Sequence, residues 1–191
     1  TGLARAVTLH GAPGVGKSSL ARWLGERGHE VGACEVLRAV HGPSPSPAHG
    51  IAYAVRRHLQ CGDLSGGPLI AQLARRLGCD PADPRLQTFA ALVDPDDVHP
   101  LRYGVRLNRR ARHRALLSLL ERLSDTRPVV LWVDDAHWGH DTLTFLHQLM
   151  PVRAARRVRV LAVCTIRDDL LAGRPREGRL LTDLEDRPGV T

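Results

Sequence analysis

Lysine is almost absent from this 191-residue chain. The sequence has 27 Lys and Arg residues, but only Lys17 is a lysine, so the other 26 are arginines. A motif that needs a second lysine is therefore excluded. Asparagine is as scarce, because Asn108 is the only one and Arg109 follows it. The guanine-selecting signature of GTPases, which needs an Asn followed by a Lys, is therefore absent.

Long apolar runs and paired cysteines are also missing. The longest apolar runs, such as residues 129–133, are too short to span a bilayer, and no secretion signal opens the chain. No CxxC pair occurs, and the cysteines are far apart, which favours buried reduced thiols over a disulfide framework or a zinc site. They are Cys34, Cys61, Cys79 and Cys164. These absences predict a cytoplasmic protein with no membrane partner.

The remaining composition is that of an ordinary globular domain. Hydrophobic residues make up 43% and charged residues 25%, which is enough for a core at this length. We expect a single domain over residues 1–191. Because the chain begins at Thr1 and its only methionine is Met150, we expect it to be a fragment of a longer multidomain protein.

Apolar strands and amphipathic helices alternate along the sequence. Strands are predicted over 6–10, 128–133 and 158–166, with a weaker one near 30–34. Helices are predicted over 18–24, 51–59, 69–77, 85–93, 105–123 and 142–150, with Asp141 as the N-cap of the last and a short helix around 180–184. This order predicts an α/β fold, the three-layer sandwich of P-loop NTPases, with a central parallel sheet flanked by helices. We expect it to be truncated at Thr191, before a fifth core strand and lid.

The segment GAPGVGKS over residues 11–18 matches the P-loop pattern, GxxxxGK followed by Ser or Thr, at every fixed position. Its glycines allow the backbone N–H groups to turn inward around phosphate oxygens, and the following helix N-terminus favours an anion. Lys17 is expected to reach the terminal phosphates and Ser18 to bind Mg²⁺. Because the guanine-selecting signature is absent, adenine is the expected base. The candidate ATP-binding residues are Gly11, Ala12, Pro13, Gly14, Val15, Gly16, Lys17, Ser18 and Ser19.

The apolar run 129–133 ends in two carboxylates, Asp134 and Asp135, as in a Walker B motif. Asp134 is expected to hold Mg²⁺ and Asp135 to act as the general base toward water. The alternative is that Asp135 only begins the next loop. Arg167 follows the apolar run 158–166, where it could sense the γ-phosphate, although one of 26 arginines could also stand there by abundance.

Two histidines flank Trp138 directly after this motif. With the two aspartates, His137 and His140 could form a zinc cluster, but Mg²⁺ explains the carboxylates better. We expect His137 and Trp138 to shape the γ-phosphate side of the site or to pack beneath it.

Three segments together resemble a known family: GAPGVGKSSLARWL, VVLWVDDAHWGHDTLTFL and VRVLAVCTIRDDLL. They are similar to the AAA+/STAND-type P-loop ATPase modules, related to origin-recognition ATPases, of large bacterial LuxR-type regulators and multidomain signalling proteins. The resemblance implies phosphate and Mg²⁺ binding by residues 16–18, Mg²⁺ binding by Asp134, and hydrolysis through Asp135. Arg167 matches the arginine that such modules carry after the fourth core strand.

The resemblance also implies a biological role. Such modules are ATP-driven conformational switches with slow turnover that bind ATP and ADP and self-associate or contact neighbouring domains. Any DNA contact would then come through domains outside this segment. One departure is His140, which stands where these proteins commonly place an acidic residue after the HW pair.

Two other functions are compatible with parts of the sequence. A P-loop kinase or transferase for a small substrate would share the phosphate loop, although the paired aspartates are less usual there. A basic nucleic-acid-binding module would explain the arginines at 102, 106, 109, 110, 112 and 114. However, aromatic residues make up only 4% of the chain, and a solvated helix face explains these charges as well.

Overall fold

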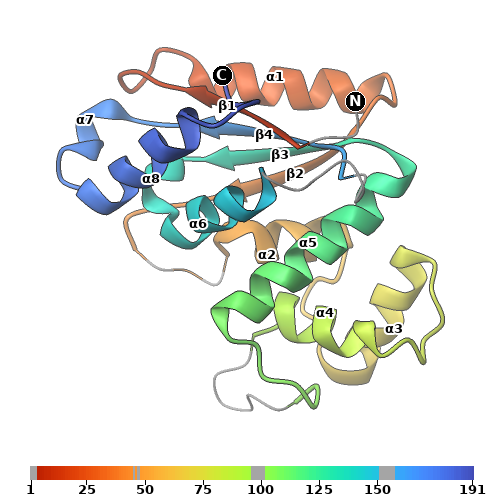
Figure 1. The fold of residues 1–191 in the computed structure, drawn as a ribbon. Helices are drawn as coiled ribbons and strands as arrows, with labels where there is room; N and C mark the ends of the chain where they lie inside the picture. The colour runs from red at the N-terminus through yellow and green to blue at the C-terminus, as the bar shows by residue number, and fades with distance from the viewer. Residues whose placement is uncertain (1–3, 45, 47, 96–101, 151–157) are drawn as a thin grey trace.

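The central element of the computed structural model is a four-stranded, all-parallel sheet with the order β1-β4-β3-β2 (Figure 1). The structure describes residues 4–44, 46, 48–95, 102–150 and 158–191. The strands are β1 (Arg5–Leu9), β2 (Glu35–Val40), β3 (Val129–Asp134) and β4 (Val160–Thr165). Because all four strands are parallel, their carboxyl ends meet at one edge of the sheet.

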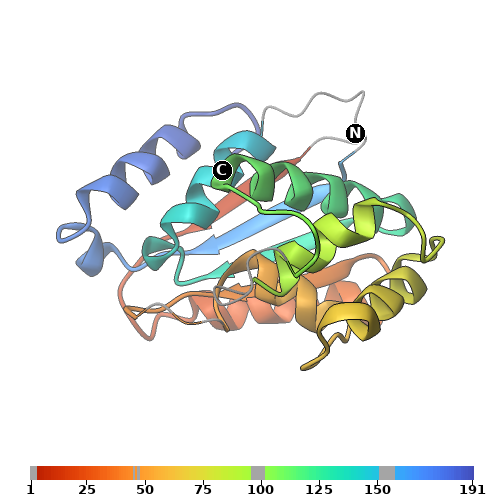
Figure 2. The ribbon, with the colours of Figure 1, turned by 90° about the horizontal axis from the view of Figure 1, so that it is seen from below.

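Helices cover both faces of this sheet, as predicted. Helix α1 (Lys17–Glu30) covers one face, and α2 (Gly50–His58), α5 (Arg109–Thr126) and α6 (His140–Leu149) cover the other (Figures 1 and 2). Helices α3 (Gly66–Leu77) and α4 (Arg85–Val93) pack farther from the sheet, and α7 (Asp168–Leu171) and α8 (Pro175–Glu185) follow β4. The short 3₁₀ helix η1 (Ala136–Trp138) joins β3 to α6. The predicted α/β fold is confirmed.

Strand β3 lies at the centre of the core. All six of its residues are buried, in agreement with the lack of alternation in its sequence. Val129, Leu131 and Val133 belong to the larger apolar cluster, and Val130 and Trp132 pack with Ala21 beneath α1. The strand that ends in the two aspartates is therefore held from both sides.

The prediction of a weak strand near residues 30–34 is wrong in position. Helix α1 continues to Glu30, and the strand begins only at Glu35. The true strand includes two charged residues, Glu35 and Arg38, which hide it from an apolar pattern. An edge strand tolerates them because it pairs with β3 alone.

Two predicted helix boundaries also differ. Helix α5 begins at Arg109 and not at 105, because Asn108 caps it by accepting a 2.9 Å hydrogen bond from the Ala111 N–H. Helix α6 begins at His140 with Gly139 as its N-cap. Asp141 therefore lies in the first turn of α6, and its prediction as the N-cap is wrong.

The apolar stripe of α1 does not face the sheet. Leu20 is 52%, Trp23 62% and Leu24 37% exposed, whereas Ala21 and Gly25 are buried. A Cβ atom on Gly25 would lie 3.2 Å from a Val36 methyl group. The helix thus packs through its smallest residues, which brings its backbone close to β2.

The last residues extend the sheet beyond β1. The Ala6 N–H donates to the Gly189 carbonyl at 3.1 Å, and the Thr8 N–H donates to the Thr191 carbonyl at 2.9 Å. A parallel bridge joins Ala6 to Val190. Residues 189–191 thus pair at the edge of β1, where the sequence places the beginning of a fifth strand.

Two further observations concern thiols and membranes. All four cysteines are free, and three of them are buried, as the sequence predicts. None of the helices in the described ranges is both long and apolar enough to cross a membrane.

Candidate functional site

The predicted phosphate loop lies between β1 and α1. Gly11, Gly14 and Gly16 have φ values of 139°, 83° and 95°, a region that favours glycine. Residues 12–16 are exposed, and residues 17–19 form the first turn of α1, whose N-cap Gly16 offers no side-chain hydrogen bond. The N–H groups of this turn are thus free of a side-chain cap and suited to an anion.

The Lys17 side chain folds back over its own loop. Its ammonium group donates 2.7 Å hydrogen bonds to the carbonyl oxygens of Gly11 and Ala12. The ammonium group of the single lysine therefore lies against the loop. Both of these hydrogen-bond acceptors are neutral carbonyl groups, and neither is a carboxylate. A phosphate group would offer it a charged acceptor.

The phosphate loop and the end of β3 meet through a hydroxyl–carboxylate contact. Ser18 Oγ donates to Asp134 Oδ1 at 2.8 Å. Thr165, at the end of β4, donates to the same oxygen at 2.8 Å and is only 1% exposed. Hydroxyl and carboxylate oxygens are the donors that Mg²⁺ prefers, so Ser18 and Asp134 fit the predicted metal ion.

Arg38 of β2 holds the other oxygen of this carboxylate. Its Nη2 donates to Asp134 Oδ2 at 2.7 Å, and its guanidinium carbon lies 4.2 Å from the centre of the Trp132 ring. Burial alone would raise the pKa of Asp134, but the hydrogen bonds from Arg38, Ser18 and Thr165 outweigh burial and lower that pKa. Asp134 is therefore ionised over the ordinary pH range.

Asp135 has an unusual backbone conformation. Its φ and ψ are 55° and 48°, in the left-handed region, and its N–H donates to Thr165 Oγ1 at 3.0 Å. Thr165 thus contacts both aspartates. Its hydroxyl group donates to the Asp134 side chain and accepts from the Asp135 backbone N–H. The turn at Asp135 directs the chain away from β3 into η1.

The two histidines of the zinc alternative are separated. His137 is fully buried and its Nδ1 accepts a 3.4 Å hydrogen bond from the Arg167 N–H, whereas the 45% exposed side chain of His140 pairs with Glu177 at 3.3 Å. Within the described residues, no group of three or more His, Cys, Asp or Glu side chains could hold a metal ion. Trp138 stacks under Arg174, whose guanidinium carbon lies 3.6 Å from its ring centre.

Arg167 follows β4 at the same edge of the sheet as the phosphate loop. Its guanidinium pairs with Asp169 at 2.8 Å, and the hydrogen bond to Asp169 raises the pKa of Arg167. A role at the γ-phosphate would require the guanidinium to leave Asp169. That role stays a prediction.

His10 connects the phosphate loop to the C-terminal helices. Its Nδ1 lies 2.7 Å from Asp168 Oδ1, and its Nε2 lies 2.6 Å from Glu185 Oε1. Burial alone would lower the pKa of His10, but the two carboxylates outweigh burial and raise that pKa. The residue before the loop is thus tied to α7 and α8.

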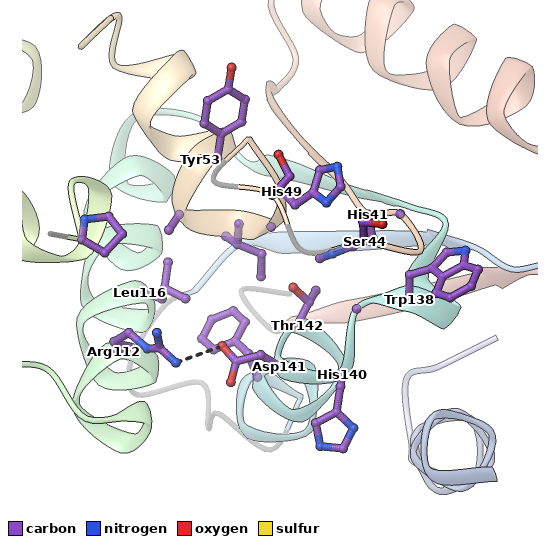
Figure 3. A pocket seen from close by; sticks show the side chains of 18 of the residues that line it. His41, Ser44, His49, Tyr53, Arg112, Leu116, Trp138, His140, Asp141 and Thr142 are labelled. Carbon is purple, nitrogen blue, oxygen red and sulfur yellow. Dashed lines mark ion pairs between the residues drawn. The ribbon is translucent and has the colours of Figure 1, made fainter. Parts of the chain in front are cut away.

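A hollow of about 690 Å³ lies beside this site, between the loop after β2 and helices α2, α5 and α6 (Figure 3). The side chains that line it are both apolar and polar, and they include Leu116 and Phe145 as well as Ser44, His49 and Tyr53. His41 and Trp138 line it where β2 and η1 end. None of the described residues that line it belongs to the phosphate loop.

Sequence reasoning missed Arg38, Thr165 and His10 as parts of the site. Thr165 could be found from the sequence, because it lies near the end of the predicted strand 158–166, two residues before Arg167. Arg38 could not be found in this way, because the strand predicted near residues 30–34 does not include it. The partners of His10 lie 158 and 175 residues away in the sequence.

One of the comparisons with known proteins identifies a family. The AAA ATPase domain family matches residues 1–163 of the chain. Neither a curated protein nor a solved structure matches it.

Proposed function

Because the chain belongs to the AAA ATPase domain family, we propose that it binds ATP with Mg²⁺ through residues 11–19 and Asp134 and hydrolyses it slowly. The 2.8 Å contact between Ser18 Oγ and Asp134 Oδ1 carries this proposal. It joins the phosphate loop to the end of β3 across 116 residues of sequence. That is the arrangement in which one divalent ion can contact both groups.

Each residue has a distinct part in the proposed reaction. Mg²⁺, when bound, neutralises charge on the β- and γ-phosphates. The N–H groups of residues 16–19 and the Lys17 ammonium bind and orient the phosphates. Asp135 accepts a proton from the water that attacks the γ-phosphorus, while the bond to the ADP oxygen breaks. Arg167, once released from Asp169, stabilises the negative charge on the oxygens of the γ-phosphoryl group.

Nucleotide binding tests the first half of this proposal. A fluorescent ATP analogue should bind in the presence of Mg²⁺, and Lys17→Ala should weaken it by about tenfold or more, since a charge-assisted contact is lost. Arg22→Ala, which removes another cation from α1, is the matched control. Equal affinity of the parent and Lys17→Ala would contradict the proposed site.

Product analysis tests the second half. Asp135→Asn should keep the affinity for the analogue but lose hydrolysis, because an amide cannot accept the proton. Phosphate and ADP should appear in equal amounts. If ADP formed without free phosphate, transfer to a small molecule would replace hydrolysis, and the hollow of about 690 Å³ would be the place to look for that molecule.

We further propose that the domain acts as a conformational switch in a bacterial signalling or transcription-regulatory protein, with copies of itself or neighbouring domains as partners. The resemblance in the three sequence segments supports this role. Sedimentation of the protein with ATP and with ADP tests it, because a switch that self-associates should change mass between the two. The same mass with both nucleotides would contradict self-association.

We propose that any contact with DNA is made by other domains of such a protein and not by the basic stretch of this one. Arg102 and Arg112 in the basic stretch pair with Asp94 at 3.5 Å and Asp141 at 3.8 Å. Arg109, Arg110 and Arg114 are exposed along α5, in keeping with a solvated face. Direct DNA binding with a steep dependence on salt would contradict this assignment.

A further inference from the structure

Arg38 lies at the metal-binding carboxylate but has no part in the proposed reaction. Asp134 Oδ1 already accepts from Ser18 and Thr165, both at 2.8 Å. Oδ2 accepts from Arg38 at 2.7 Å. The Asp134 side chain is 8% exposed and that of Arg38 40% exposed, so the carboxylate is nearly closed off while the cation still reaches solvent.

The guanidinium and a metal ion cannot both use this carboxylate without cost. A divalent cation at Ser18 and Asp134 would lie within a few ångströms of the Arg38 charge, and like charges at such a distance repel strongly in a partly buried site. Among the described residues, Oδ2 is the oxygen that Ser18 and Thr165 do not contact, and Arg38 donates to it. Metal binding and the Arg38–Asp134 pair therefore oppose each other.

The surroundings of Arg38 offer the guanidinium another position. Arg38 and Trp132 face each other across the β2–β3 register and line a hollow of about 370 Å³ beside α1. Glu26 and Glu35 also line this hollow. Glu35 already pairs with Arg127 at 3.6 Å, so Glu26 is the carboxylate that a displaced guanidinium would meet in this hollow.

We propose that Arg38 is a displaceable counter-ion of the metal site. It neutralises Asp134 while no metal is bound, and it leaves Asp134 and the face of Trp132 when Mg²⁺ and ATP bind. This inference rests on the Mg²⁺–ATP binding proposed above. Its consequence is that a side chain of the edge strand β2 changes position beside α1 when the nucleotide binds.

The Mg²⁺ dependence of nucleotide binding tests the competition. With a fluorescent ATP analogue at fixed concentration, Arg38→Ala and Arg38→Gln should both lower the Mg²⁺ concentration at half-saturation by about fivefold or more, the size of a typical coupling between sites. Arg22→Ala, which removes a cation from the same hollow without touching Asp134, should change it much less. If Arg38 only orients Asp134, Arg38→Ala raises this concentration and Arg38→Gln does not lower it, and either result overturns the proposal.

The fluorescence of Trp132 tests the movement. In a Trp23→Phe, Trp138→Phe background that still binds the analogue, Trp132 is the one remaining indole. Unlabelled ATP with Mg²⁺ should change its emission, and Arg38→Ala in the same background should abolish that change. ATP with EDTA should leave the emission as it was.

The two proposals fail in different ways. If neither the parent nor the variants bind the analogue at any Mg²⁺ concentration, the proposed function is wrong. If the analogue binds but Trp132 emission is constant, or changes equally in Arg38→Ala, Arg38 does not move and only the inference is wrong.

Discussion

Gly139 and His41 pack against each other where the ends of β2 and β3 meet. A Cβ atom on Gly139 would lie 2.8 Å from two atoms of the His41 ring. The His41 N–H donates to the Asp134 carbonyl at 3.1 Å, so this contact lies directly beside the candidate metal site. The φ of Gly139 is −100°, which suits any residue. The reason for a glycine at the N-cap of α6 is therefore the close approach of the His41 ring.

We predict that Gly139→Ala lowers the free energy of unfolding by about 1–3 kcal/mol, because the new methyl group displaces the His41 ring. The matched control is Gly178→Ala inside α8, where an added Cβ meets nothing within 4 Å. That variant should gain up to about 1 kcal/mol from helix propensity. Urea denaturation measures both, and equal stability of Gly139→Ala and the parent would contradict the close contact.

His41 also makes stability depend on pH. Burial, followed by repulsion from His49 and His137, lowers the pKa of His41 from 6.5 to about 4, although Asp134 acts in the opposite direction. Between these two pH values the unfolded chain binds a proton that the folded chain does not. Stability therefore falls as the pH drops from 6.5 toward 4, and this loss is absent at neutral pH.

We predict that His41→Gln reduces the stability lost between pH 7.5 and pH 5 by about 2 kcal/mol, as a shift of this size implies. His10 provides the control of opposite sign, because its pKa is raised. Its contribution is present below pH 6.5 and is lost as the pH rises through its folded pKa. His10→Gln should therefore enlarge the loss on acidification, and equal pH profiles of the parent and His41→Gln would contradict the assignment.

At the scale of elements, α5 begins with positive charge where a helix favours negative charge. Its first turn contains Arg109 and Arg110 and no acidic residue. The partial positive charge of a helix N-terminus repels such side chains. The side-chain cap from Asn108 offsets part of this cost.

We predict that Arg110→Glu raises the free energy of unfolding by about 1 kcal/mol through the helix dipole. Asn108→Ala should lower it by a similar amount, since the Ala111 N–H loses its acceptor. Thermal denaturation at low salt measures both changes, and high salt should reduce the first but not the second. A loss of stability in Arg110→Glu would show that this arginine has a favourable partner.

At the scale of the whole molecule, the proposed ligand joins segments that are far apart in the sequence. Residues 11–19, Asp134 and Thr165 come from three strand ends, and a ligand that binds only this assembled edge must stabilise the folded state. We predict that Mg²⁺–ATP at about 100 times its Kd adds about 2.7 kcal/mol, which corresponds to a rise in Tm of about 5–10 °C. At the same ligand concentration Lys17→Ala should reduce this rise by about half or more, and a rise of equal size in that variant would place the ligand elsewhere.

The sequence was sufficient for features that depend on local pattern. The phosphate loop, the buried strand before Asp134 and the α/β class each follow from residue types at fixed spacing, and the fold confirms the class. The weak strand failed because β2 lies at an edge and carries Arg38 and Glu35, which no apolar pattern detects. The apolar residues Leu20, Trp23 and Leu24 do not mark the packed face of α1, because close approach to β2 selects Gly25 and Ala21 over larger apolar residues.

The local sequence therefore determined which chemical groups the candidate site can use and which strand or helix contains each of them. This is because the hydrogen bonds within an element join residues that are close in the chain. Only the tertiary structure decided which side chains share a carboxylate. Asp134 meets Ser18, Arg38 and Thr165 because parallel strands bring their ends together at one edge. The one lysine remains at the phosphate loop. Among the 26 arginines, Arg38 is distinguished by its hydrogen bond to Asp134 and its position over Trp132.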